Sequence, residues 1–203
     1  MKFVFSDQQR LVFFGDSVPA GHAEPGEGFV AQALARIRAR YAGLELEVFR
    51  PDPGERTLAE LVETLPGRAA SLEPDWVILM LGPAALSEIG LEGFDRQYRA
   101  LVRELKARTR AGLILCEPFV LQPDPADSLR RRIDGYREAA WLVAQGSLAV
   151  FVPCQKAFDR VLVGTQAGDW GLPNRLQLNR FGSALLTEEF LGATGFEVFD
   201  DDH

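Results

Sequence analysis

The chain has 203 residues, of which 47% are hydrophobic and 25% charged, and its formal net charge is −7. This composition is that of an ordinary globular domain, which excludes a disordered chain, a collagen-like repeat and a coiled coil. The acidic balance argues against nucleic-acid binding, because neutralising phosphates requires clustered lysines and arginines. We expect a single domain over residues 1–203, with residues 199–203 forming a flexible acidic tail.

Two cysteines are too few for a disulfide scaffold or a zinc site. Cys116 and Cys154 each end an apolar run, which predicts that both are small buried hydrophobic residues. The N-terminus lacks a signal-peptide pattern, and no stretch approaches the roughly eighteen apolar residues that a membrane helix needs. The sequence therefore predicts a cytoplasmic protein with no membrane attachment, no metal and no cofactor.

Short apolar runs alternate along the chain with segments in which apolar residues recur at helical spacing. Thr57 and Glu60 form a capping-box pattern at the start of one such helix. In chain order the patterns predict strand 11–14, helix 29–41, strand 44–49, helix 57–65, strand 76–81, helix 94–110, strand 113–116, helix 128–145, strand 148–152, helix 155–162 and helix 180–191. Strands separated by helices need crossover connections, so we predict an α/β fold: a three-layer α/β/α sandwich around a five-stranded parallel sheet.

In an open parallel sheet, ligands bind at the carboxyl ends of the strands. Four segments follow predicted strands or precede the last helix: Gly15-Asp16-Ser17, Pro51-Asp52-Pro53-Gly54, Gly82-Pro83-Ala84-Ala85 and Asn174-Arg175-Leu176-Gln177. Ser17 follows a strand and a glycine, where a hydroxyl can lie exposed beside helix-terminal N–H groups. By itself, however, a Gly-Asp-Ser triplet is typical of a simple turn.

The block Leu11-Val12-Phe13-Phe14-Gly15-Asp16-Ser17 resembles the nucleophile block of the SGNH (GDSL-type) lipases and esterases. Pro74-Asp75-Trp76-Val77 and Met80-Leu81-Gly82 look like the strand that leads to that family's Gly-x-Asn-Asp block. Other segments are similar to the branch of acetyl xylan esterases and related carbohydrate deacetylases: Glu117-Pro118-Phe119, Asp134-x-Tyr136, Val152-Pro153-x-Gln155-x-Ala157-Phe158 and Gly195-Phe196-Glu197. The resemblance implies an SGNH-hydrolase (flavodoxin-like) fold for the whole chain.

The resemblance also implies a mechanism. In the family a serine attacks the ester carbonyl, a histidine accepts its proton, and an aspartate three residues earlier orients the histidine. The serine N–H, a glycine N–H and an asparagine side chain form the oxyanion hole. Matched position by position, Ser17 is the nucleophile and Gly54 the oxyanion-hole glycine, whereas Ala84 replaces the asparagine and Asn174 and Gln177 replace the aspartate and the histidine.

These replacements remove the chemistry. A glutamine amide has no basic lone pair near neutral pH, so Gln177 cannot accept the serine proton. Ala84 lacks an oxyanion donor worth about 10²–10³ in rate, and losing the histidine of a triad costs on the order of 10⁶. A remnant oxyanion hole leaves a rate acceleration of roughly 10³ over the reaction in water. We therefore predict a pseudoenzyme or a very weak ester hydrolase.

A different base would instead make the chain an active serine esterase or deacetylase acting on acetylated small molecules or carbohydrates. His22 follows Ser17 in a loop expected at the rim of the pocket, although an exposed loop histidine is the simpler interpretation. His203 falls in the acidic tail, Asp16 points away from Ser17 in an extended segment, and Asp169 would need a remodelled loop. None of these four residues is a strong candidate for the base.

The replacements of aspartate by Asn174 and histidine by Gln177 keep polar groups of similar reach, so a hydrogen-bonded chain from Ser17 stays satisfied when buried. Drift after loss of catalysis and retention of a pocket for a small molecule or glycan both fit this pattern. A structural or regulatory subunit is a third interpretation, and the oligomeric state stays open. For the structure we predict strand order 2-1-3-4-5, with Ser17, Gly54, Ala84 and Gln177 converging at the carboxyl edge and the tips of Ser17 and Gln177 within about 8 Å.

Overall fold

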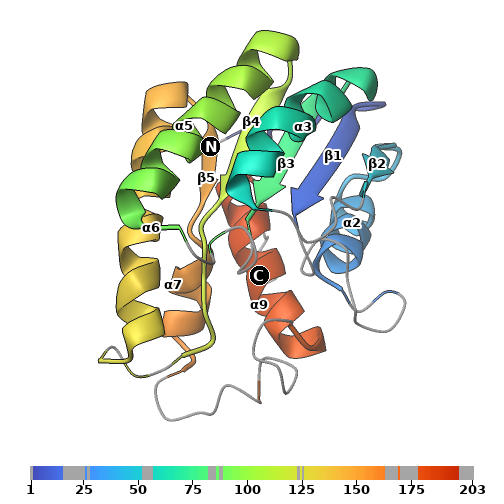
Figure 1. The fold of residues 1–203 in the computed structure, drawn as a ribbon. Coiled ribbons are helices and arrows are strands. Elements are labelled where there is room, and N and C mark those ends of the chain that lie inside the picture. The colour runs from blue at the N-terminus through green and yellow to red at the C-terminus, as the bar shows by residue number, and fades with distance from the viewer. Residues whose placement is uncertain are drawn as a thin grey trace.

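The computed structural model describes residues 2–15, 26, 28–51, 57–81, 86, 89–122, 124, 126–162, 169 and 178–196 (Figure 1). Strands and helices alternate along the chain, as the sequence predicts. In chain order they are β1 (Arg10–Gly15), α2 (Phe29–Arg40), β2 (Glu47–Phe49), α3 (Leu58–Ser71), β3 (Trp76–Met80), α5 (Leu91–Arg108), β4 (Gly112–Cys116), α6 (Ser128–Ser147), β5 (Val150–Val152), α7 (Cys154–Asp159) and α9 (Arg180–Ala193).

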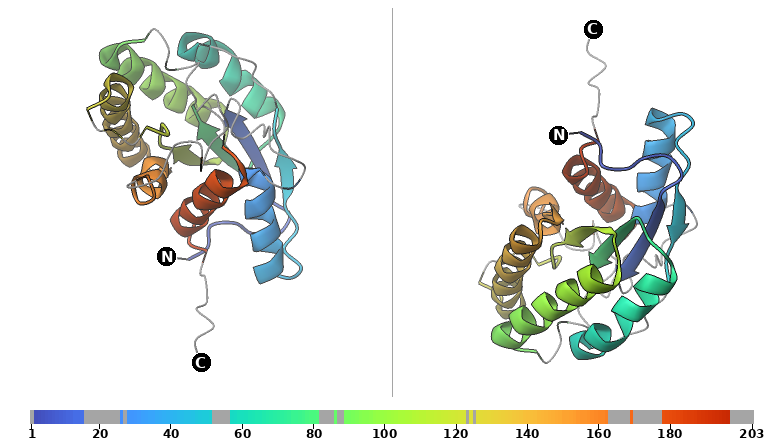
Figure 2. Two further views of the ribbon diagram at one scale, coloured as in Figure 1. Left: turned by 90° about the horizontal axis from the view of Figure 1, so that it is seen from below. Right: turned by 90° about the horizontal axis from the view of Figure 1, so that it is seen from above.

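The strands form one parallel sheet in the order β2-β1-β3-β4-β5, which confirms the predicted topology. Helices cover both faces: α3, α5 and α6 lie on one side and α2 and α9 on the other (Figure 2). The three-layer α/β/α sandwich is therefore confirmed as well.

Alternation along β1 divides its side chains between two cores. Val12 and Phe14 pack into the layer of α3, α5 and α6, while Leu11 and Phe13 pack into the layer of α2, α7 and α9. All four are almost completely buried. A strand buried on both faces needs an unbroken apolar run, which is why the runs predicted the strands correctly.

Most element boundaries differ from the predicted ones by one to three residues or more, and three of these differences have a clear local reason. The helix predicted over 57–65 continues through Pro66 to Ser71, because Leu65, Pro66 and Ala69 are buried on one face. The helix predicted from residue 94 begins at Leu91, since Gly90 adopts the extended N-cap conformation. The strand predicted over 44–49 is confined to Glu47–Phe49 at the sheet edge.

Both cysteines behave as predicted. Cys116 and Cys154 are unbridged and buried, with exposed fractions of 1% and 0%. Burial raises the pKa of the Cys154 thiol well above its usual value. Within the described part of the chain, no helix combines the length and the apolar character needed to cross a membrane.

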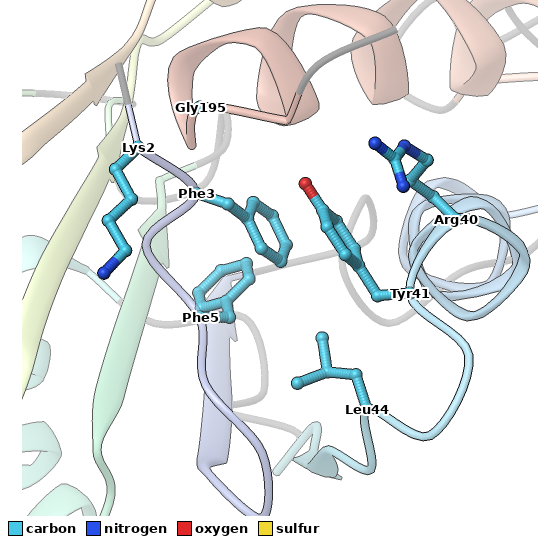
Figure 3. A pocket seen from close by; sticks show the side chains of 7 residues that line it. All are labelled: Lys2, Phe3, Phe5, Arg40, Tyr41, Leu44 and Gly195. Atoms are coloured by element: carbon cyan, nitrogen blue, oxygen red, sulfur yellow. The ribbon is translucent and has the colours of Figure 1, made fainter. Parts of the chain in front are cut away.

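The segment before β1 packs at the amino end of the sheet, against the ends of α2 and α9. The Phe3 ring stacks on Tyr41 with centroids 4.7 Å apart, and the backbone N–H of Val4 donates to the carbonyl of Thr194 at 3.0 Å. A pocket of about 390 Å³ opens between these elements (Figure 3); it is lined by Lys2, Phe3, Phe5, Arg40, Tyr41, Leu44 and Gly195.

Gly195 is required at this junction. Its φ of +78° lies in the left-handed region, and a Cβ at this position would lie 2.5 Å from the carbonyl oxygen of Lys2. Gly192, in α9, is different: a Cβ there meets nothing within 4 Å. The two glycines therefore form a matched pair for substitution.

We expect Gly195→Ala to lower the free energy of unfolding by about 2 kcal/mol, because it combines strained φ with a backbone clash. Gly192→Ala should instead raise this free energy by about 0.5–1 kcal/mol, since alanine is the better helix former. Urea denaturation followed by circular dichroism measures both changes. Equal stability of Gly195→Ala and the wild-type chain would contradict the assignment.

Candidate functional site

The carboxyl ends of the central strands lie side by side. The register pairs Gly15 at the end of β1 with Met80 at the end of β3, and Met80 with Cys116 at the end of β4. After β1 the chain crosses to β2 on one side of it, and later returns as β3 on the other side. This is the point of strand-order reversal at which ligands bind in open α/β sheets.

The predicted site residues lie outside the described residues. This holds for the expected nucleophile and oxyanion-hole positions and for the replaced positions, namely Ser17, Gly54, Ala84, Asn174 and Gln177. It also holds for Asp16, His22 and His203. Their convergence at the carboxyl edge, and the distance of about 8 Å between Ser17 and Gln177, stay predictions.

The segment that carries Asn174 and Gln177 in the sequence is followed by the start of α9, which the structure does describe. Asn179 caps α9: its Oδ1 accepts from the N–H groups of Phe181 and Gly182 at 2.9 and 3.0 Å. The Asn179 Nδ2 donates to the carbonyl of Asp169 at 2.9 Å. The side chain of Asp169 is exposed, so this residue contributes a backbone anchor beside the helix.

A buried charged residue, Glu117, follows β4 directly. It is 5% exposed, its Oε1 accepts from Arg137 Nε at 2.9 Å, and its Oε2 accepts from the backbone N–H of Gln155 at 2.8 Å. Gln155 is the second residue of α7, whose N-cap Pro153 supplies no side-chain cap. Glu117 therefore caps α7 from the neighbouring strand, and Arg137 balances its charge.

The Gln155 side chain, fully buried, continues this contact. Its Oε1 accepts from the N–H of Val120 at 2.8 Å, and its Nε2 donates to the carbonyl of Val120 at 3.2 Å. The same Nε2 donates to Asp159 Oδ1 at 2.9 Å. One amide thus satisfies both backbone groups of Val120, as a neighbouring strand would.

Charged residues of α6 and α7 close the network into a ring. Arg130 pairs with Asp159 at 2.7 Å and with Asp134 at 3.3 Å, and Arg137 pairs with Asp134 at 2.7 Å. Burial favours the neutral form of Arg137, but hydrogen bonds and charge from Glu117 and Asp134 outweigh it and raise the pKa of Arg137. We call Glu117, Arg137, Asp134, Arg130, Asp159 and Gln155 the polar ring.

The sequence interpretation did not assign a role to the polar ring. Glu117, Asp134 and Gln155 appeared there only as points of family resemblance, and the two arginines and Asp159 were not singled out. One signal was present: Glu117 is a charged residue directly after the apolar run 113–116, where a carboxylate is costly unless it is paired. The partners come from distant segments and could not be identified from spacing.

A second pocket, of about 460 Å³, lies at the same end of the sheet, between the start of α5 and the first half of α6. Its lining residues are Ile89, Gly90, Leu91, Arg131, Arg132, Gly135 and Tyr136. Arg132 is held in place by hydrogen bonds to the carbonyl of Leu86 and to the hydroxyl of Tyr136. Among the residues that the structure describes, no cluster of histidine, cysteine and acidic side chains is suited to a metal ion.

Comparison with known proteins adds a family and a relative. The model of a family described as GDSL-like Lipase/Acylhydrolase matches residues 13–182. An acetylxylan esterase of Geobacillus stearothermophilus is 27% identical over 212 residues, covering 93% of this chain and 95% of that protein. The match extends across nearly the whole of both proteins.

Solved structures agree with the sequence comparison. The acetylxylan esterase Axe2 of G. stearothermophilus superposes with a TM-score of 0.85 at 25% identity, over 97% of this chain and 98% of that one. LAE5, an alpha/beta hydrolase enzyme from the metagenome of Lake Arreo, Spain, has the same TM-score at 24% identity, covering 96% and 98%, and shares the fold. Variants of Axe2 with a serine, an aspartate or a histidine changed to alanine are described as catalytic mutants, and the aspartate stands three residues before the histidine.

The polar ring predicts a pH dependence of stability. Burial acts to raise the pKa of Asp159, but hydrogen bonds from Arg130 and Gln155 outweigh it, so the pKa is lowered. A lowered folded-state pKa stabilises the chain above the unfolded value of about 3.9 and loses that effect as pH falls through the folded value. We expect Asp159→Asn to cost about 1 kcal/mol at pH 7 and progressively less below about pH 4.

Urea denaturation of wild-type and Asp159→Asn chains between pH 7 and pH 2.5 measures this difference. Glu47→Gln is the control, because the pair of Glu47 with Arg10 is exposed and should contribute only about 0.2–1 kcal/mol. A difference between wild type and Asp159→Asn that stays constant with pH would contradict the prediction.

Proposed function

The chain belongs to the GDSL-like lipase/acylhydrolase family, and from this premise we propose that it binds acetylated sugars or small acetyl esters but hydrolyses them very slowly or not at all. The ligand class follows from the similarity to acetylxylan esterases, and the binding place is the carboxyl edge of the sheet. The chain keeps a serine and a glycine at the expected positions, Ser17 and Gly54. It thereby retains two backbone donors for an ester carbonyl.

One observation carries the proposal: the pair Asn174 and Gln177 just before α9. In the acetylxylan esterase an aspartate precedes a histidine by three residues, and alanine at either position gives a catalytic mutant. The present chain has the same spacing with an asparagine and a glutamine, shortly before the capped start of α9 at Arg180. Gln177 offers an amide where a base is needed, so the hydroxyl of Ser17 stays protonated and weakly nucleophilic.

The residues that replace the catalytic ones favour a retained binding site over a site that has drifted to apolar packing. An amide at position 177 can hydrogen-bond a serine hydroxyl or a ligand carbonyl, and Asn174 can in turn hydrogen-bond that amide. Ala84 makes the opposite side smaller and apolar, which suits the methyl group of an acetyl ester. The site therefore keeps the groups that recognise an ester and lacks the group that activates the nucleophile.

The first test is release of p-nitrophenol from p-nitrophenyl acetate. We expect the wild-type chain to accelerate hydrolysis by no more than about 10³ over water, and Ser17→Ala to change this rate less than about tenfold. A rate far above this level that disappears in Ser17→Ala would contradict the proposal and favour an active esterase. His22→Ala would then show whether His22 supplies the base.

The second test restores the missing groups. Gln177→His alone should give little activity, because Asn174 holds an imidazole in the wrong tautomer, and an asparagine in place of the aspartate costs about 10⁴ in a working triad. Adding Asn174→Asp should recover most of that factor, because a carboxylate orients the ring and stabilises the imidazolium. Ala84→Asn should add about 10²–10³ by returning an oxyanion donor.

The control for the restored triple variant is the same protein carrying Ser17→Ala, with circular dichroism confirming that both are folded. If the triple variant shows turnover that depends on Ser17, this supports the position-by-position match of the site to the family. A folded triple variant without such turnover would mean that the pocket has changed shape, and drift would be the better account.

A further inference from the structure

We infer that Glu117 and Gln155 are positioning residues, which clamp the segment 117–122 to α7 and so form a rigid wall at the carboxyl edge of the sheet. We further infer that this wall limits the size of the acyl group that the site accepts; this second part rests on the proposed function. Neither residue is assigned to the reacting atoms. Their role is exerted through the backbone that they hold.

The clamp is needed because the sheet cannot hold this segment. The parallel pairing of β4 with β5 ends at Cys116 and Val152, and the N–H of Glu117 makes one further bond, to the carbonyl of Val152. Residues 117–122 then continue without regular secondary structure while remaining largely buried. Backbone groups buried in this way need partners, and the Gln155 amide supplies two of them at Val120.

The carboxylate of Glu117 fixes the other side of the clamp. Its bond to the Gln155 N–H orients the first turn of α7, and thus places the Gln155 side chain opposite Val120. Arg137 holds the second oxygen of Glu117 from α6. Three elements far apart in the sequence therefore meet on one carboxylate, and its removal takes a bond from each of them.

The remaining members of the polar ring restrict the alternatives. Each carboxylate of the ring is bonded to an arginine, and Asp159 also accepts from Gln155. A change of rotamer at Gln155 would break three hydrogen bonds within a buried site, and a shift of α6 would break the charge pairs. The ring therefore allows a single arrangement of segment 117–122.

The wall that results is apolar. Val120 and Leu121 are buried in the two opposite cores, and Phe119, half-buried, stacks on Phe158 with ring centroids 4.9 Å apart. The wall leaves the sheet from β4, the strand next to β3, after which Ala84 follows in the sequence. Because packed side chains are close to incompressible, a wall fixed in this place excludes longer acyl chains sterically.

The first experiment is amide hydrogen exchange by NMR on the full chain. Glu117→Gln keeps the shape of the side chain and removes the charge, while Gln155→Met keeps the length and removes the amide. We expect exchange of the Val120 and Gln155 N–H groups to accelerate at least about tenfold in Glu117→Gln, and that of Val120 in Gln155→Met, while β1 and β3 are unchanged.

The matched control is Asp95→Asn, which breaks an exposed carboxylate–arginine pair with Arg99 on α5. It should leave exchange at Val120 at the wild-type rate. Two outcomes would overturn the clamp: no acceleration at Val120 in a folded Glu117→Gln or Gln155→Met chain, or equal acceleration of every amide. The second outcome would show a contribution to global stability without local positioning.

The second experiment tests acyl selectivity in the Asn174→Asp/Gln177→His background, with and without Glu117→Gln. A loosened wall should raise the ratio of kcat/KM for p-nitrophenyl butyrate over p-nitrophenyl acetate about tenfold, mainly through a lower KM for butyrate. An unchanged ratio together with faster exchange at Val120 would overturn the role in selectivity. If the Asn174→Asp/Gln177→His chain has no turnover dependent on Ser17, the proposed function and the role in selectivity are both contradicted. The hydrogen-exchange result still tests whether Glu117 and Gln155 clamp the segment 117–122.

Discussion

Parallel pairing of β1 with β2 on one side and β3 on the other is the constraint from which the arrangement follows. Parallel strands need crossover connections, and these place helices on both faces and all carboxyl ends at one edge. Because the chain leaves β1 at Gly15 for one side and later returns on the other, the connections diverge there and leave room for a ligand. The sequence resemblance predicts the family's reacting groups at this edge, and the fold itself does not depend on them.

The β4–β5 side of that edge is organised differently from the rest of the core. Elsewhere apolar side chains fill both layers, whereas here three carboxylates, two arginines and one amide lie among them. Only Glu117 and Gln155 of the ring are buried, whereas Asp134 and Asp159 are partly exposed. Exposed ion pairs contribute little, and a buried pair is often matched by apolar residues of equal volume, so stability alone does not account for the polar ring. Directional bonds at fixed distances do account for it, since they define one position for a segment that lacks a neighbouring strand.

The local pattern of apolar residues was sufficient to predict the strands and helices, but it was insufficient to predict the polar ring. The apolar run at residues 76–81 predicts a doubly covered strand because its burial depends on its own side chains. The helix end at Ser71 was missed because burial of Pro66 outweighs the usual effect of proline, which is a tertiary effect. Glu117 bonds to Arg137 and Gln155, which are 20 and 38 residues away in the sequence. At such separations the spacing of residues does not predict which side chains meet. Ser17, Gly54 and the three replaced positions came from resemblance to a family, because a serine in a turn is not specific by itself.

The bond between Val4 and Thr194 places the two ends of the described chain side by side, with Lys2 next to Gly195 (Figure 3). A short linker across this junction, with new termini opened at the exposed turn at Gly43, would give a circular permutant with the same sheet. In the natural chain the packing of α9 on α2 joins segments about 150 residues apart, as in the bond from Gln32 to Arg180. In the permutant, α9 would precede α2 in the chain, which shortens the sequence separation of this contact to roughly a third and should accelerate folding.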